Sequence, residues 1–159
     1  MTIRGFLISL TTVAALVVGL AAPPPARAET DEPLIVVELY TSQGCSSCPA
    51  ADAFLGELLA MRDDVLGLEF HVDYWDNLGW KDIFSSAEST ARQRAYAKSL
   101  GLAYVYTPQM VINGSANEVG SDKMAVITAI ENARKSSATH LDISVVQDAD
   151  GGLNISLPA

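Results

Sequence analysis

The feature that most constrains the fold is a pair of cysteines between an apolar segment and the expected start of a helix. Cys45 and Cys48 are the only cysteines in the chain, and they follow the apolar run Leu34–Tyr40 after a short polar turn. Pro49 comes next, and because proline lacks a backbone N–H it is tolerated only in the first turn of a helix. The order predicts a strand over 34–40, then the cysteine pair, then a helix over 50–61.

A thiol at the start of a helix has altered chemistry. The unpaired N–H groups and the helix dipole stabilise a thiolate there and lower its pKa. A bridge between Cys45 and Cys48 would close too short a loop to stabilise the fold much by restricting the unfolded chain. Redox chemistry or metal binding is therefore favoured, and an inert structural disulfide is the alternative.

The first 28 residues have the pattern of a secretory signal peptide. Arg4 precedes an uncharged run over 6–22, and Ala26-Arg27-Ala28 provides a cleavage motif before Glu29. The run is shorter than the roughly 20 residues that a spanning helix needs, so a retained anchor is the less favoured alternative. We expect residues 1–28 to be removed, no membrane association after cleavage, and a periplasmic or secreted protein.

Charge excludes several partners. The chain has 10 basic and 19 acidic residues, and loss of Arg4 and Arg27 leaves 8 basic residues and a net charge of −11. So acidic a chain has no basic footprint for nucleic acid or for an anionic membrane surface. The remainder is long enough for one domain, over 29–136, followed by a tail over 137–159.

The rest of the chain alternates between strand and helix patterns. After a strand over 65–73, a capping box at Ser85 and Glu88 predicts a helix that runs through Ala91, Ala95, Tyr96 and Leu100 and ends at Gly101. A strand over 109–112, a turn at Asn113-Gly114 and a strand over 115–119 are expected to form a hairpin. The last helix is expected to be capped by Ser121 or Asp122 and to direct Met124, Ile127 and Ile130 inward. Residues 141–157 alternate in polarity on both sides of a turn. They predict a separate β-hairpin, interpreted as the start of a truncated β region.

This order resembles the thioredoxin fold, an α/β fold of three layers with β-α-β followed by β-β-α and an inserted helix. The strings Glu38–Pro49 and His71–Asp76 are similar to a family of secreted bacterial thioredoxin-like proteins of unassigned function, domain of unknown function 1223. The resemblance covers roughly residues 34–135.

Roles for individual residues follow from position and from this resemblance. Cys45, nearer the turn and more exposed, is expected to be the attacking thiol, and Cys48 the resolving thiol. The resemblance implies that Pro108 is cis and faces the pair, with the Thr107 backbone accepting a client chain; an ordinary trans proline is the alternative. Glu38 resembles a buried acid of raised pKa that relays a proton, with a salt-bridged glutamate as the alternative.

Three functions remain open. The first is an exported thiol–disulfide oxidoreductase that acts on protein thiols or disulfides and needs no organic cofactor. The second is a copper-binding or copper-delivery module that uses Cys45, Cys48 and His71, because cuprous copper accepts soft thiolate ligands. The third is a non-catalytic interaction domain. Tyr74, Trp75, Trp80 and Phe84 form an aromatic segment that is interpreted either as a partner surface or as helix cover.

Overall fold

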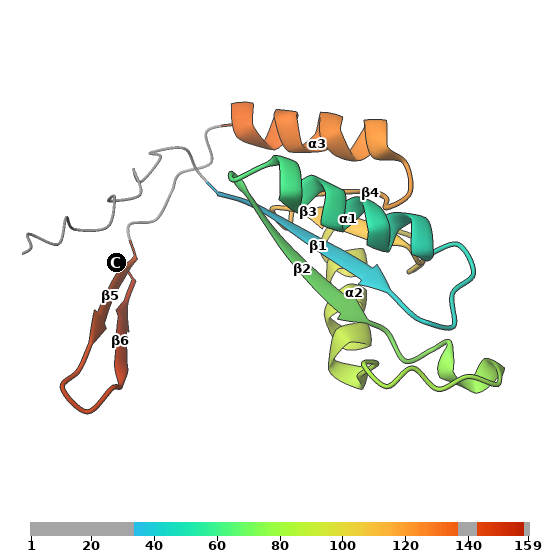
Figure 1. Ribbon diagram of the computed structural model, residues 1–159, viewed down its shortest axis with the longest axis horizontal. Helices are drawn as coiled ribbons and strands as arrows, with labels where there is room; N and C mark the ends of the chain where they lie inside the picture. Colours follow the sequence, from blue (N-terminus) through green and yellow to red (C-terminus); the bar gives the residue numbers. More distant parts are fainter. Residues whose placement is uncertain (1–33, 137–142, 158–159) are drawn as a thin grey trace, which may run out of the picture. The chain divides into compact units, whose positions relative to one another are not determined.

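A computed structural model describes residues 34–136 and 143–157. Its centre is a four-stranded sheet of order β2-β1-β3-β4 (Figure 1). The strands are β1 (Ile35–Thr41), β2 (Val65–His71), β3 (Gln109–Ile112) and β4 (Ala116–Val119). β1 and β2 are parallel, whereas β3 runs antiparallel to both β1 and β4.

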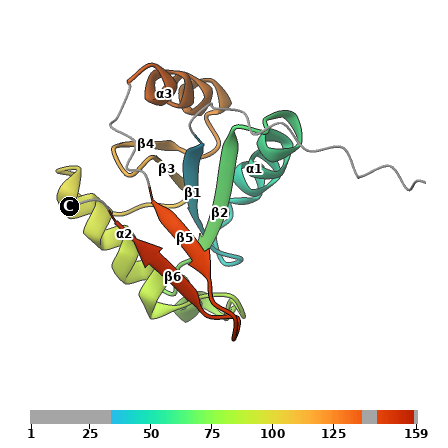
Figure 2. The same ribbon diagram turned by 90° about the vertical axis from the view of Figure 1, so that its left-hand side faces the viewer.

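Helices cover both faces of this sheet (Figures 1 and 2). They are α1 (Pro49–Met61), α2 (Ala87–Ser99) and α3 (Lys123–Lys135), and a short 3₁₀ turn, η1 (Asp76–Leu78), follows β2. α1 and α3 lie on one face and α2 on the other. This three-layer architecture confirms the α/β class and is consistent with a thioredoxin-like fold.

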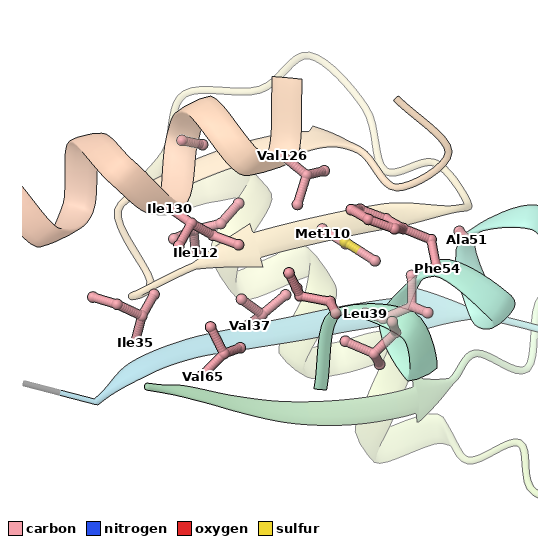
Figure 3. Packing of buried hydrophobic residues seen from close by; sticks show 13 residues of the cluster. Ile35, Val37, Leu39, Ala51, Phe54, Val65, Met110, Ile112, Val126 and Ile130 are labelled. Atoms are coloured by element: carbon pink, nitrogen blue, oxygen red, sulfur yellow. The ribbon is translucent and has the colours of Figure 1, made fainter. Parts of the chain in front are cut away.

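β1 is the central strand, as its continuous apolar sequence predicts. Its side chains Ile35, Val37 and Leu39 are buried against Phe54 of α1 and Ile130 of α3 (Figure 3). Each large side chain buried in this way stabilises the fold by about 1.5 to 3 kcal/mol. Since β1 is hydrogen-bonded on both edges and covered on both faces, the segment that follows it starts from a rigid base.

The opposite face of the sheet is more polar than the sequence pattern suggests. Ser89, Thr90 and Gln93 are the buried polar residues of α2, whereas Ala91 and Ala95 are exposed. The Gln93 amide explains this inversion, because its Nε2 donates to Gln109 Oε1 at 2.9 Å and to the Tyr106 carbonyl at 2.7 Å. Hydrogen bonding to the sheet therefore helps to orient α2, together with the packing of Tyr96 and the burial of Ala97.

Two details of the helix predictions are wrong. The N-cap of α2 is Ser86, whose Oγ accepts from Ser89 N at 3.0 Å, while the Ser85 hydroxyl donates to Asp76. In α3 the cap is Asp122 as expected, but Met124 is exposed and Val126, Ala129 and Ile130 form the buried stripe. Both differences are shifts within an element whose existence and type are correct.

Both hairpins are confirmed. Asn113 and Gly114 have φ of 46° and 65°, as a two-residue hairpin turn requires, and Asn113 Oδ1 accepts from Val36 N. The tail forms β5 (Ser144–Gln147) and β6 (Leu153–Ser156), paired antiparallel. The expected signal peptide and the boundaries at residues 28 and 137 lie outside the described residues. Among those residues, no helix has both the length and the apolar character to cross a membrane.

Candidate active site

The two cysteines lie where the sequence predicts, at the amino-terminal end of α1. They form a disulfide with an S–S distance of 2.10 Å, and Cys48 is the N-cap residue of the helix. The Cys48 carbonyl accepts from Ala51 N at 2.8 Å and from Asp52 N at 3.1 Å, so the helix begins directly at the pair. A thiolate released here would sit next to the positive end of the helix dipole.

Cys45 is more exposed than Cys48, as expected, but only by a small margin. Cys45 is only 2% exposed and Cys48 is 0% exposed, although Ser46 and Ser47 between them are exposed. The Cys45 sulfur lies 3.5 Å from the Ser47 hydroxyl. Position in a turn suggested an open thiol, but neighbouring segments cover it.

The turn that leads into Cys45 is fastened by several hydrogen bonds. Buried Thr41 donates from Oγ1 to Asp52 Oδ1 at 2.6 Å, which ties the end of β1 to the first turn of α1. Gly44 N donates to Ser42 Oγ at 3.1 Å, and Gln43 N donates to Asp82 Oδ2 at 2.8 Å. The position of the pair is thus set from both β1 and the segment after β2.

Asp82 is a buried junction of this network. It is 1% exposed, and its carboxylate accepts from the backbone N–H groups of Gln43 and Phe84 and contacts His71 Nδ1 at 2.6 Å. Burial alone would raise the pKa of Asp82, but the Gln43 N–H and His71 outweigh it and lower that pKa. The carboxylate is held ionised beside the turn that precedes Cys45.

His71 was an alternative copper ligand in the sequence interpretation. Its Nδ1 contacts Asp82, and its Nε2 lies 3.1 Å from Glu69 Oε1. Within residues 34–136 and 143–157, no three His, Cys, Asp or Glu side chains are grouped to hold a metal ion. The structure therefore engages both ring nitrogens of His71 with carboxylates and does not bring His71 together with the cysteines as a ligand set.

Thr107 and Pro108 form the second part of the site. The peptide bond between them is cis, as the resemblance implied, and Pro108 is buried. Gly120 lies between Pro108 and α1. If a Cβ were added to Gly120, it would lie 3.3 Å from Pro108 Cβ and 3.0 Å from Ala51 Cβ. Thr107 Oγ1 accepts from Trp75 Nε1 at 2.9 Å.

Glu38 does not have the properties expected of a proton relay. It accepts from both Arg92 Nε, at 2.6 Å, and Arg92 Nη2, at 2.8 Å, and from the hydroxyls of Tyr40 and Tyr96. Burial raises its pKa, but these hydrogen bonds lower the pKa further than burial raises it, so the net shift is downward. The expected raised pKa is wrong, and the salt-bridged alternative holds.

The reason is the direction of the side chain. Successive residues of a strand point to opposite faces, so a shift of one position exchanges the faces. Leu39 is buried in the cluster with α1, whereas Glu38 bonds to α2. Glu38 therefore faces α2, on the opposite side of the sheet from α1, which begins at the cysteine pair.

Comparison with known proteins identifies the family. Residues 36–159 match the family described as "Protein of unknown function (DUF1223)". The chain belongs to this DUF1223 family.

A solved structure supports the same assignment. The chain is similar to the crystal structure of protein AGR_C_4864 from Agrobacterium tumefaciens, with 39% sequence identity and a TM-score of 0.69. The match covers 82% of this chain and 59% of that chain, so this chain corresponds to little more than half of the solved protein. No match was found among curated proteins.

Two acidic residues of this DUF1223 chain, Asp52 and Asp82, hold the turn that precedes the cysteine pair, and the sequence analysis did not single them out. Asp52 lies one helical turn after Cys48, in the first turn of α1, where a negative charge interacts favourably with the positive end of the helix dipole. An acidic residue at that position of the expected helix could have been identified from the sequence. Asp82 is 39 residues from its partner Gln43 and no local pattern marks it.

Proposed function

We propose that this DUF1223 chain is an exported, thioredoxin-like thiol–disulfide oxidoreductase with Cys45–Cys48 as its redox couple. The observation that carries the proposal is a disulfide at the first turn of α1, the same turn in which Ala51 shares a close contact at Gly120 with Pro108. The couple itself carries two electrons, so the reaction requires no organic cofactor.

The exchange reaction has two steps. In the reduced protein the Cys45 thiolate attacks a client disulfide, forms a mixed disulfide and releases one client thiolate, which takes up a proton. The Cys48 thiolate then attacks Cys45 Sγ, re-forms the Cys45–Cys48 bond and releases the second client thiol. The client is reduced by two electrons and the protein is oxidised by two; the reverse sequence oxidises a dithiol client.

The fold supports these assignments in two ways. The N–H groups at the start of α1 favour a thiolate over a thiol at the pair, because they present a partial positive charge to it. The hydrogen bonds of buried Thr41 to Asp52 and of Gln43 to buried Asp82 fix the turn, so the sulfur atoms keep their positions during exchange. Glu38 is assigned a structural part in this scheme, on the α2 face.

Export and partners are part of the proposal. Residues 1–28 have the sequence of a signal peptide, and disulfides persist in the periplasm and outside the cell. The partners would be protein thiols or disulfides, and the acidic chain argues against nucleic acid and anionic membranes.

The deciding experiment is the reduction potential of Cys45–Cys48 in protein that lacks residues 1–28, equilibrated against glutathione or dithiothreitol buffers. We expect a reversible couple between about −120 and −270 mV, the range of thiol oxidoreductases. A potential below roughly −300 mV would mark an inert structural disulfide and overturn the proposal.

Two cysteine variants complete the test. Cys48→Ser should accumulate a mixed disulfide between Cys45 and a client, because the resolving thiol is absent. If Cys45→Ser keeps the biological function, the chain is an interaction domain instead. If both variants lose tight cuprous binding and the wild type never forms the bridge, the copper alternative replaces the oxidoreductase.

A further inference from the structure

The cysteine pair is enclosed although the proposed reaction requires access to it. Cys45 is 2% exposed and Cys48 is fully buried, while the serines between them are open to solvent. An incoming thiolate must approach Cys45 Sγ along the S–S axis, which needs free space beyond the sulfur. Some neighbouring group must therefore move before exchange can begin.

A series of close contacts, here called the ring, links the turn before Cys45 to the Thr107–Pro108 segment and to the start of α1. Gly44 precedes Cys45, and a Cβ on Gly44 would lie 3.1 Å from Trp75 Cβ. The Trp75 indole N–H donates to Thr107 Oγ1 at 2.9 Å. From Thr107 the ring continues through Pro108 and the contacts of Gly120 to the first turn of α1, which starts at Cys48. Trp75 is the member that joins the Cys45 turn to the Thr107–Pro108 segment.

The backbone that carries Trp75 is fastened at both ends. Asp73 accepts from Thr90 Oγ1 at 2.6 Å, and Asp73 N donates to the same hydroxyl at 3.1 Å. Further along the same loop, buried Asp82 accepts from Gln43 N and contacts His71. Movement of the whole loop would break all of these bonds. Rotation of the Trp75 side chain breaks its hydrogen bond to Thr107 and some of its packing against Tyr74 and the neighbouring cluster, but it leaves the bonds of the loop intact.

We propose that the Trp75 indole, held closed by its hydrogen bond to Thr107, is a gate that controls which thiols and disulfides reach Cys45. The inference rests on the proposed exchange reaction. Thr107 is also the residue whose backbone is expected to accept a client chain, so an extended client must displace the indole in order to bind. Trp75 thus determines specificity: a client that binds at Thr107 opens its own path to the disulfide, and a small thiol must wait for spontaneous opening.

The test measures access to the disulfide in the oxidised, purified full-length protein. A dithiothreitol thiolate attacks Cys45 Sγ, breaks the bond to Cys48 and leaves the electron pair on Cys48, which takes up a proton; the second dithiothreitol thiol then releases Cys45. The rate of this reduction is compared in wild type, Trp75→Phe and Thr107→Val. Phenylalanine keeps a ring but removes the donor, and valine keeps the shape of threonine but removes the acceptor.

We expect each variant to be reduced roughly two- to tenfold faster, the effect of one net hydrogen bond on the closed state. Both substitutions remove the Trp75–Thr107 bond, and Thr107→Val also removes the contact of its hydroxyl with Tyr74, so the double variant should be no faster than Thr107→Val alone. Unchanged rates in both single variants would overturn the gate. The gate would also be overturned if the two accelerations multiplied in the double variant, because that result would indicate that each substitution loosens the site independently of the shared bond. Thermal melts of each variant show whether the fold is retained.

Trp80→Phe is the matched control, because Trp80 is in the same loop and donates to Gln43 Oε1 but is 62% exposed. Its reduction rate should equal that of the wild type. It also leaves Trp75 as the single tryptophan of the chain, which contains two. In this variant, indole fluorescence should shift to the red when a single-cysteine peptide forms a mixed disulfide with Cys45, and an unshifted spectrum would contradict displacement of the indole.

The gate and the proposed function fail separately. If Trp75→Phe and Thr107→Val accelerate reduction without additivity but the potential lies below roughly −300 mV, the gate stands and the oxidoreductase does not. If the potential is that of an oxidoreductase and the rates do not change, the function stands and the gate is overturned.

Discussion

Replacement of Glu38 by glutamine tests whether this buried acid stabilises the fold or relays protons. The carboxylate is 4% exposed and accepts four hydrogen bonds, two from Arg92 and one each from Tyr40 and Tyr96. Glutamine keeps the shape of the side chain, but it replaces one acceptor oxygen by an N–H₂ donor and removes the charge. The paired contact with Arg92 cannot survive this change.

The magnitude follows from these contacts. A hydrogen bond to a charged group contributes about 1.5 to 3 kcal/mol, and removal of one partner of a fully buried ion pair costs about 3 to 5 kcal/mol. The Arg92 side chain is 47% exposed, so water can solvate the guanidinium once its partner is lost. We therefore expect the free energy of unfolding to fall by about 2 to 3 kcal/mol, below the figure for a fully buried pair.

Urea unfolding of the oxidised protein measures this difference, and its pH dependence gives a second check. Since the pKa of Glu38 is lowered in the folded state, its contribution is complete above the unfolded value near 4.5. The contribution is lost as pH falls through the lower folded pKa. The gap in unfolding free energy between wild type and Glu38→Gln should narrow below about pH 4.5.

Two controls make the prediction specific. Glu57→Gln removes an acid of α1 that is paired with Lys123 at the surface, where both side chains are about half exposed, and it should change stability by less than about 1 kcal/mol. The rate of thiol exchange should not change in Glu38→Gln. A variant of unaltered stability, or one in which exchange slows tenfold or more, would refute the structural assignment and restore the proton relay.

Three further substitutions test the surroundings of the site by urea unfolding. Gly120→Ala should lose about 1 to 3 kcal/mol, because its Cβ would lie 3.0 Å from Ala51 Cβ, and a loss below 0.5 kcal/mol would show that the contact relaxes freely. Asp82→Asn should lose about 2 to 3 kcal/mol, since the buried carboxylate accepts from Gln43 N; an unaffected variant would contradict its part in fixing the turn. Gly114→Ala should lose about 1 kcal/mol, because φ is 65° there, and equal stability would contradict the assigned turn.

The sequence alone determined the elements and their order. Pro49 is tolerated in a helix only in its first turn, Asn113-Gly114 is typical of a tight hairpin turn, and the apolar run at β1 indicates a strand covered on both faces. These features are set by dihedral preferences and periodicity, which act over a few residues. They were sufficient to locate Cys45 and Cys48 at the start of α1.

Only the tertiary structure decided which side chains meet at the site. Glu38 faces α2 because its side of the strand depends on register, which a one-residue shift reverses. Cys45 is buried, and Trp75, thirty residues further along the chain, lies against the preceding glycine and bonds to Thr107. Contacts between such distant segments depend on how the layers pack. Local propensity carries no information about that packing, so the enclosure of the disulfide could not be predicted from the sequence.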